Sequence, residues 1–291
     1  MSRKRIVVRI SEDSWSARCF GAESSVPDGS EIELCRFDEP PASVVEAIGR
    51  LLPNPSSFAY TLLLDSPRVF VSRFPADEFH GANNRQELAF RFEEGLPVNA
   101  EDLLCDFVVP ERKKQNSTES ILALGTLREL VLGLNESFRS RGLQIESVAS
   151  ETLVHTQAAI SAFALPENGC LLVPNTNSFD AVVWSDAGLI AWRHGLSSVN
   201  IQRDLQLLFG ELQEELNVFV LSREDSNELV ESLPPKLCER VLHSHERNFD
   251  DAYVGCITKR KELWSDFARD PALQTFTSAK QTQATLLCAS V

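Results

Sequence analysis

The pattern of apolar and polar residues predicts three strands at the start of the chain. Residues 6–10 form a short apolar run, and four polar residues separate it from its predicted hairpin partner at 15–20. Residues 31–37 alternate between apolar and polar, which predicts a third strand. Residues 40–52 place apolar side chains at helical spacing behind a proline pair, and residues 60–64 form a buried apolar run. The pattern therefore predicts an α+β unit of three strands, a helix and a fourth strand.

Residues 84–109 predict a short helix, a stop, a turn and a strand. Asn84 is the expected N-cap, and Glu87 three positions later completes a capping box. Gly95 and Pro97 end the helix, because glycine tolerates the left-handed cap and proline cannot continue the hydrogen-bond ladder. The β-branched and aromatic residues that follow are typical of a strand.

The rest of the chain continues this alternation of strands and helices. On either side of the run we expect strands at 68–74 and 120–124, a polar loop at 110–118, and helices at 127–141 (capped by Thr126) and 151–164. Residues 169–193 repeat the hairpin pattern of residues 6–20, as a duplicated core would. Short helices are expected at 227–233 and near 251–256, and the polar residues after 270 should be loose.

The strongest helical signal in the chain begins at Asn200. Apolar residues then recur at spacings of three and four, which predicts one long helix with a single apolar face. These residues are Leu205, Leu208, Phe209, Leu212, Leu216, Phe219 and Val220.

The helix, stop and strand at 86–109 resemble the inserted subdomain of the actin-like assembly platforms. This family includes the type IV pilus protein PilM and the cytoplasmic part of the type II secretion protein GspL. The resemblance rests on a glutamate-rich helix, the Gly95-Leu96-Pro97 stop and the strand that begins Asp106-Phe107, together with the element order on both sides.

That resemblance implies an α/β fold with mixed sheets, of the actin-like, ribonuclease-H-like type, with two domains and an inserted subdomain. Residues 1–66 and 148–165 would form the first actin-like subdomain. Residues 67–147 would be the insertion, and residues 166–291 the second domain with its loose tail.

Active ATPases of this fold hold phosphates and Mg²⁺ between two hairpins of the form Asp-x-Gly-Ser/Thr. In this chain both hairpins are degenerate at the aspartate and the glycine, and Pro174 also removes a backbone donor. The positions concerned are Arg9, Ser11 and Ser14 in the first hairpin, and Pro174, Thr176 and Ser178 in the second.

The resemblance therefore implies a pseudo-ATPase with no catalytic residues, no cofactor and no metal, for which ATP and Mg²⁺ are not expected. The glycine pair that cradles adenosine is also absent, apart from Gly255. Asp13, Asp180 and Asp186 stay candidates for a metal if the hairpins are aligned a few residues away.

Composition excludes several other classes of function. The net charge of −14 disfavours nucleic acid and direct docking on anionic lipid. Seven scattered cysteines suggest reduced thiols, and no run approaches the roughly 20 apolar residues that span a bilayer. His243 and His245 lie two apart, so on a helix their side chains would diverge rather than share a metal.

The resemblance assigns the chain a scaffolding role at the inner membrane, on its cytoplasmic side. Expected partners are the assembly ATPase and the cytosolic N-terminal tail of a bitopic membrane protein of the PilN or GspM kind. The tail would lie as an extended peptide between the first subdomain and the insertion. Its expected contacts are Val69, Val71, Phe74, Phe90, Phe92, Leu96 and Phe107.

Two alternatives to the scaffold hypothesis stay open at the level of sequence. The chain could instead be an active actin-like ATPase or a cell-division filament protein of the same superfold. Sequence does not separate the pilus system from the secretion system, and it leaves a homodimer open.

Overall fold

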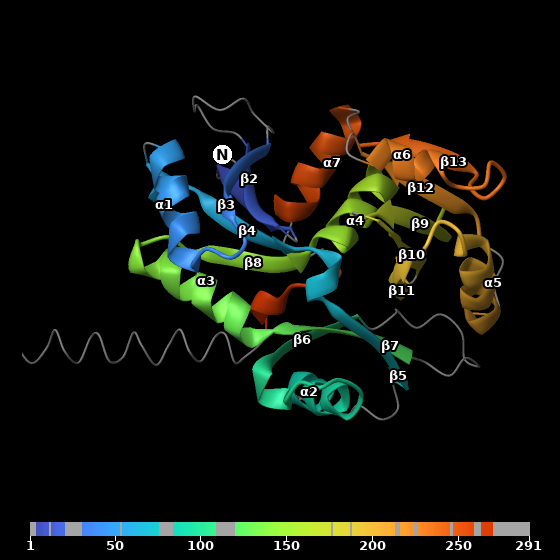
Figure 1. The fold of residues 1–291 in the computed structure, drawn as a ribbon, viewed down its shortest axis with the longest axis horizontal. Coiled ribbons are helices and arrows are strands. Elements are labelled where there is room, and N and C mark those ends of the chain that lie inside the picture. Colours follow the sequence, from blue (N-terminus) through green and yellow to red (C-terminus); the bar gives the residue numbers. More distant parts are fainter. Residues whose placement is uncertain are drawn as a thin grey trace, which may run out of the picture.

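The computed structural model describes most of the 291-residue chain. The described residues are 4–11, 13–20, 31–52, 54–75, 84–108, 120–175, 177–186, 188–212, 216–223, 226–244, 247–258 and 263–269. They form two five-stranded sheets and one three-stranded sheet, with helices between and around them (Figure 1). The mixed α/β architecture predicted from the sequence is confirmed.

The first sheet has the strand order β3-β2-β1-β4-β8. Its strands are β1 (Arg5–Ile10), β2 (Ser14–Phe20), β3 (Glu31–Arg36), β4 (Ala59–Leu64) and β8 (Ile145–Ser150). β1 pairs antiparallel with β2 and parallel with β4. Ile6 and Val8 face one layer of helices and Val7 faces the other, so both faces of β1 are buried.

Helices cover the two faces of this sheet. α1 (Pro41–Leu51) and α3 (Arg128–Ser140) lie on one face, where Ile48 and Phe138 join the core around Ile6. α4 (Glu151–Ala162) lies on the other face, with Val154 in the core that includes Val7.

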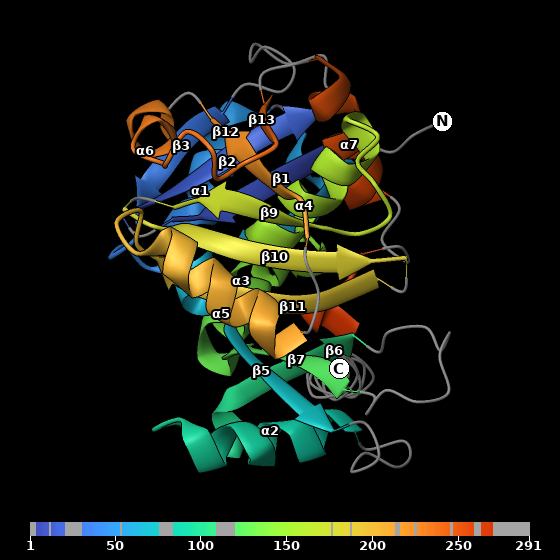
Figure 2. The ribbon, with the colours of Figure 1, turned by 90° about the vertical axis from the view of Figure 1, so that its right-hand side faces the viewer.

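The second sheet repeats this topology, with the order β11-β10-β9-β12-β13. Its strands are β9 (Gly169–Pro174), β10 (Phe179–Ser185), β11 (Gly188–Leu196), β12 (Val218–Ser222) and β13 (Arg240–His243). α5 (Ile201–Leu212) covers one face and α7 (Arg247–Thr258) joins α4 on the other (Figure 2). The short α6 (Asn227–Glu231) follows β12. α4 therefore lies between the two sheets, with apolar contacts to both.

A third, smaller unit lies below the first sheet in the view of Figure 1. Its strands are β5 (Phe70–Pro75), β6 (Leu103–Val108) and β7 (Ser120–Leu127), in the order β5-β7-β6, with α2 (Asn84–Gly95) on one face. Leu88 and Phe92 of α2 pack on the sheet. The helix ends at Gly95, at the predicted stop, but Gly95 has no positive φ and is therefore not the left-handed cap that was predicted.

A segment near the C-terminal end, residues 263–269, ties the first sheet to this smaller unit. The Asp266 carboxylate accepts from the amide of Val148 on edge strand β8 at 2.9 Å. The Asp266 amide donates to the buried carboxylate of Asp106 on β6 at 2.8 Å. Phe267 is fully buried in the core of the first sheet. The sequence pattern predicts no helix or strand for this segment.

Two predictions from the sequence are wrong. The helix that begins near Asn200 ends at Leu212, and Phe219 and Val220 lie in β12, which pairs in parallel with β9. Their spacing happens to continue the helical period, but burial on both faces of a central strand also needs continuous apolar residues. Thr126 does not cap α3, because it lies inside β7 and Leu127 is the N-cap residue, without a side-chain hydrogen bond.

Several expectations fall outside the described residues: Thr176, His245, the polar loop at 110–118 and the tail after 270. Within the described ranges, no helix combines the length and the apolar character needed to cross a membrane.

Candidate functional site

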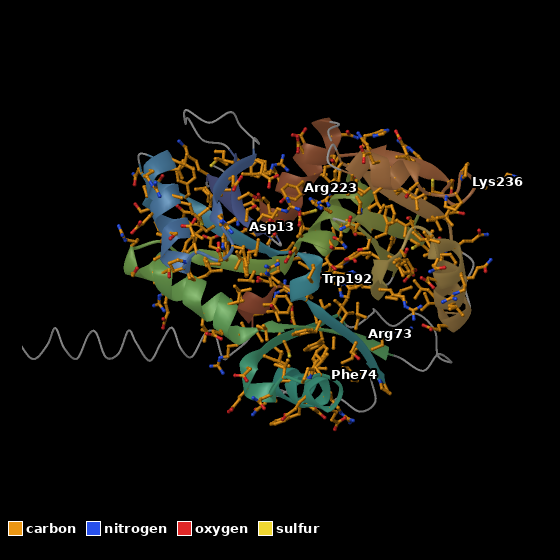
Figure 3. The ribbon with its side chains drawn as sticks, viewed as in Figure 1. Asp13, Arg73, Phe74, Trp192, Arg223 and Lys236 are labelled. Carbon is orange, nitrogen blue, oxygen red and sulfur yellow. The ribbon has the colours of Figure 1, made fainter. Side chains whose placement is uncertain are left out.

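An ion-pair cluster joins the two large sheets at the ends of their first strands. Arg9 of β1 places its Nε 2.7 Å from Glu151 Oε1, at the first residue of α4. Arg223, directly after β12, places Nη1 3.5 Å from the same oxygen. Its Nη2 donates to the carbonyl of Pro174 at the end of β9. One carboxylate thus binds a guanidinium from each sheet, and Arg223 lies in the central part of the molecule (Figure 3).

The cluster is largely buried, and its charges depend on one another. The side chains of Arg9, Glu151 and Arg223 are 25%, 10% and 16% exposed. Burial raises the pKa of Glu151, but Arg9, His155 and Arg223 outweigh it and hold that pKa below its ordinary value. Burial lowers the pKa of His155 to about 3, against the opposing effect of Glu151. Glu151 is therefore charged and His155 neutral near pH 7.

In the turns of the two hairpins, the described residues form hydrogen bonds with one another. Ser11 donates from its amide to the carbonyl of Ser14 at 2.9 Å, and its hydroxyl oxygen accepts from the Ser14 amide at 3.2 Å. In the second hairpin, the amide of Asn175 donates to the carbonyl of Ser178 at 2.8 Å.

Aromatic side chains fill the space between the sheets beside this cluster. Phe20 of β2 and Tyr253 of α7 have ring centroids 6.0 Å apart. Arg18 lies over the Tyr253 ring at 5.4 Å and forms an ion pair with Asp250 at 2.9 Å. The first sheet and α7 are therefore in direct contact.

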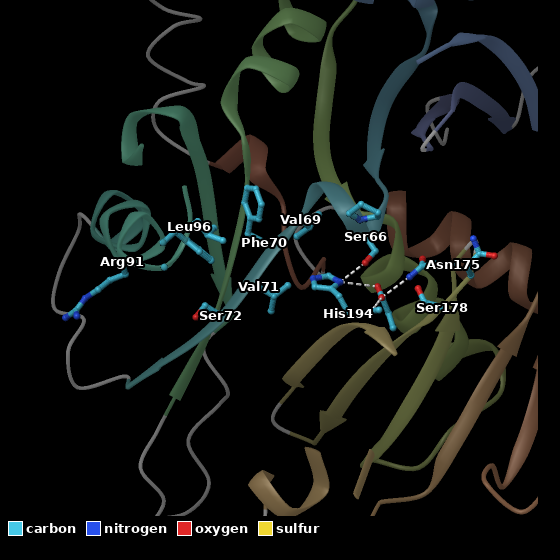
Figure 4. Close-up of a pocket in the computed structure, with 16 residues that line it drawn as sticks. Ser66, Val69, Phe70, Val71, Ser72, Arg91, Leu96, Asn175, Ser178 and His194 are labelled. Carbon is cyan, nitrogen blue, oxygen red and sulfur yellow. Dashed lines mark hydrogen bonds and ion pairs between the residues drawn. The ribbon is translucent and has the colours of Figure 1, made fainter. Parts of the chain in front are cut away.

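A pocket of about 600 Å³ opens on the other side of the second hairpin, between the small unit and the second sheet (Figure 4). Its apolar wall comes from β5 and α2: Val69, Phe70, Val71, Phe92 and Leu96, with Arg91 at its outer end. Its polar wall comes from the end of β4 and from the second sheet: Ser66, Asn175, Asn177, Ser178, Asp180 and His194.

Asp180 organises the polar wall of the pocket. The carboxylate is fully buried and accepts hydrogen bonds from four groups. These are Asn175 Nδ2 (2.8 Å), Trp192 Nε1 (3.1 Å), Thr152 Oγ1 (3.3 Å) and the Gly195 amide (3.3 Å). His194 Nδ1 lies 3.4 Å from Oδ2 and donates to it only in the tautomer that carries a proton on Nδ1. These donors satisfy the carboxylate, so Asp180 is a structural anchor for the hairpin.

Ser66, His194 and Asp180 do not form a nucleophilic triad. Ser66 Oγ lies 2.5 Å from His194 Nδ1, which is also the nitrogen nearest Asp180. A histidine that activates serine needs one ring nitrogen for the hydroxyl and the other for the carboxylate. The contact instead joins the first sheet to the second at the inner end of the pocket.

The outer edge of β5, which pairs with no other described strand, forms part of the pocket. Four consecutive residues, 69–72, line it, although alternate side chains of a strand point to opposite faces. The pocket therefore lies along the strand edge, and β5 is an edge strand of its sheet. Such an edge presents backbone N–H and C=O groups that an extended peptide can pair with.

The residues that the sequence proposed for partner binding divide into three groups. Val69, Val71, Phe92 and Leu96 line the pocket. Phe74 and Phe107 are partly buried and pack against the apolar core between the small sheet and α2; Figure 3 labels Phe74. Phe90 is 54% exposed.

The second wall of the pocket differs from the one expected. We expected the first subdomain to face the insertion, whereas most of the polar wall belongs to the second sheet. The sequence reasoning missed Ser66, Asn177 and His194. Asp180 offered a signal, because a carboxylate inside an apolar strand must find several donors.

The three aspartates that were candidates for a metal do not come together. Asp13 and Asp186 are exposed, whereas Asp180 is buried. Among the residues that the structure describes, no three His, Cys, Asp or Glu side chains are grouped as a metal site would require.

Comparison with known proteins identifies the fold. No protein-family model and no curated protein sequence matches the chain. Among solved structures, the cytoplasmic domain of EpsL, an inner-membrane component of the type II secretion system of Vibrio cholerae, is similar with a TM-score of 0.56. It is 13% identical, over 92% of this chain and 99% of that one.

Two further structures show the same likeness. A Bacteroides thetaiotaomicron protein of unknown function with an actin-like ATPase fold has a TM-score of 0.54 and 13% identity, over 88% of this chain and 96% of that one. A chain of the PilM–PilN type IV pilus biogenesis complex has a TM-score of 0.51 and 14% identity, over 83% and 88%. This protein therefore has the actin-like fold, as the sequence resemblance implied, in a form shared with EpsL and the PilM–PilN complex.

Proposed function

We propose that this protein is a non-catalytic actin-fold scaffold of a type II secretion or type IV pilus platform at the inner membrane. The observation that carries the proposal is the cluster of Arg9, Glu151 and Arg223. Its two guanidinium groups point at a carboxylate of the chain itself, between the hairpins that hold phosphates in the active ATPases of this fold.

The side chains between the hairpins do not suit a magnesium nucleotide. Arg9 replaces an expected metal-binding aspartate, and Pro174 offers no N–H to a phosphate. Asp180 already accepts hydrogen bonds from four donors of the chain itself. We therefore propose that the chain does not depend on ATP or Mg²⁺.

The proposed ligand is the cytosolic tail of a membrane-protein partner, bound as an extended peptide in the pocket. The free edge of β5 would supply main-chain hydrogen bonds, and apolar side chains of the tail would pack against Val71, Phe92 and Leu96. The net charge of −14 favours a basic tail. Contact with an assembly ATPase belongs to the same proposal, and its location stays open.

Titration calorimetry with Mg-ATP tests the non-catalytic assignment. We expect no binding heat at micromolar nucleotide, and no ATP-dependent pelleting. Micromolar binding that needs Mg²⁺ would instead favour an active actin-like ATPase, and pelleting with ATP would favour a filament protein.

Binding of a synthetic tail peptide tests the scaffold assignment. The peptide comes from a bitopic membrane protein encoded beside this one. We expect V71E to weaken binding by roughly tenfold or more, because it places a charge in the centre of the contact. V199E is the matched control, since Val199 is 88% exposed and outside the pocket. Equal binding by both variants would contradict the proposed site.

A further inference from the structure

Glu151 is the midpoint of a line of polar contacts that runs from one edge of the first sheet into the second. Glu31 on β3 lies 3.3 Å from Arg9 Nη1, and Arg9 Nε binds Glu151. Glu151 in turn binds Arg223, which donates to the Pro174 carbonyl on β9. In this line of contacts only Glu151 binds a charged group from each sheet.

The surroundings of Glu151 favour a negative charge there. Two guanidinium groups converge on Oε1, and Glu151 is the first residue of α4, where the helix dipole also favours an anion. Without this carboxylate, Glu31, which is half-exposed, would be the remaining acidic partner of Arg9 among the residues that the structure describes, and two largely buried cations would face each other.

The line of contacts also adjoins the pocket. Pro174, which accepts from Arg223, directly precedes Asn175, and Asn175 lines the pocket and donates to Asp180. On the side of the ion-pair cluster away from the pocket, aromatic and ionic contacts join β2 to α7. These contacts depend on the present distance between the two sheets.

We propose that Glu151 is a built-in latch: its carboxylate holds the two sheets closed from within the chain, where a separate anionic ligand would otherwise be needed. The latch does not depend on peptide binding. Its biological meaning rests on the proposed function, because a scaffold without a nucleotide cycle gains from keeping the two sheets permanently closed. Removing the carboxylate should leave a cationic void between Arg9, Arg223 and His155 that accepts a small anion.

Small-angle scattering and hydrogen exchange of the full chain measure closure directly. E151Q keeps the side-chain shape and removes the charge. We expect a larger radius of gyration for this variant. We also expect hydrogen exchange in β2 and α7 to be roughly tenfold faster or more, because breaking a buried ion pair lowers the equilibrium constant for the closed form by well over a factor of ten. The matched control is E146Q, since Glu146 pairs with Arg5 at 3.2 Å within the first sheet.

Chemical rescue separates a latch from a general loss of stability. E151A should melt on the order of 10 °C lower than the wild type. Added formate, compared with chloride at the same ionic strength, should raise its melting temperature in a saturable way, without such an effect on the wild type or on E146A. If E151A does not fold, the scattering and exchange of E151Q decide the question.

The latch is wrong if E151Q and E146Q give the same scattering and exchange profiles, or if formate and chloride act alike on folded E151A. These outcomes differ from a failure of the proposed function. The wild-type protein can bind no tail peptide and still carry a latch, and E151Q can keep the present closure in a protein that binds the peptide.

Discussion

At the scale of single residues, burial decides the charge state that each side chain can hold. Glu151 stays charged because Arg9 and Arg223 compensate it, whereas the neighbouring His155 stays neutral because burial and the same arginines disfavour a further cation. His155 also packs between Tyr253 and Phe249, with ring centroids 5.5 Å and 5.9 Å away. A proton on His155 would therefore place a buried charge between α4 and α7.

His155 should make the protein less stable as the pH falls. Its folded pKa, about 3, lies below the ordinary value of 6.5, so between these values the unfolded chain binds a proton that the folded chain does not. Stability due to His155 is full above pH 6.5 and is lost toward pH 3, by roughly 1 kcal/mol for each pH unit.

Urea unfolding at pH 7.5 and 5.5 checks this expectation. H155Q should lose less free energy of unfolding between the two pH values than the wild type does. H243Q, at an exposed position on β13, serves as control and should follow the wild type. An H155Q variant with the wild-type pH dependence would contradict the assignment of a neutral, buried His155.

At the scale of elements, the Trp184 ring packs so close to the start of β9 that only glycine fits there. A Cβ on Gly169 would lie 2.7 Å from Trp184 Cζ2 and 3.2 Å from a Phe219 ring carbon. Trp184 is 2% exposed, and its Nε1 donates to the Pro166 carbonyl at 3.1 Å, so the ring has little room to move.

G169A should therefore lower the free energy of unfolding by about 1–3 kcal/mol, the usual cost of overpacking. G210A is the matched control: Gly210 lies in α5, and nothing comes within 4 Å of a Cβ built there. It should raise stability by about 0.5–1 kcal/mol, because alanine favours a helix. Urea unfolding measures both, and equal effects of the two substitutions would contradict this reading of β9.

At the scale of the whole molecule, residues 263–269 connect parts that are distant in sequence. Asp266 binds the amide of Val148 in the first sheet and donates to Asp106 in the small unit. Burial raises the pKa of Asp106, against the amide of Asp266 and the cation of Arg85, which lower it. Arg85 of α2 lies 2.8 Å from Asp106, so the segment is linked to the helix that lines the pocket.

D266A should loosen this connection and leave the Val148 amide without its buried acceptor, which costs about 1–3 kcal/mol. Hydrogen exchange should rise most in β8 and β6, and much less in β9 of the second sheet. D38A, which removes only an exposed partner of Arg36, is the control. Uniform exchange changes across all three sheets would show that the segment has no local role.

The sequence alone determined the elements whose pattern is local. Apolar runs separated by polar turns predicted the two hairpins, and the Gly95-Leu96-Pro97 stop predicted the end of α2, because turns and helix ends depend on neighbours in the chain. It also identified Arg9 and Pro174 as departures from the phosphate hairpins. The helix predicted through Val220 failed, because an apolar run of this kind satisfies either a helix face or a central strand until its pairing partner is known.

Only the tertiary structure decided what the unusual residues do. Arg9, Glu151 and Arg223 come from distant parts of the sequence, and their shared contact exists only when both sheets pack on α4. The pocket likewise takes walls from β5, α2 and the second sheet. Such contacts depend on how whole elements dock, and the period of a sequence carries no information about docking partners.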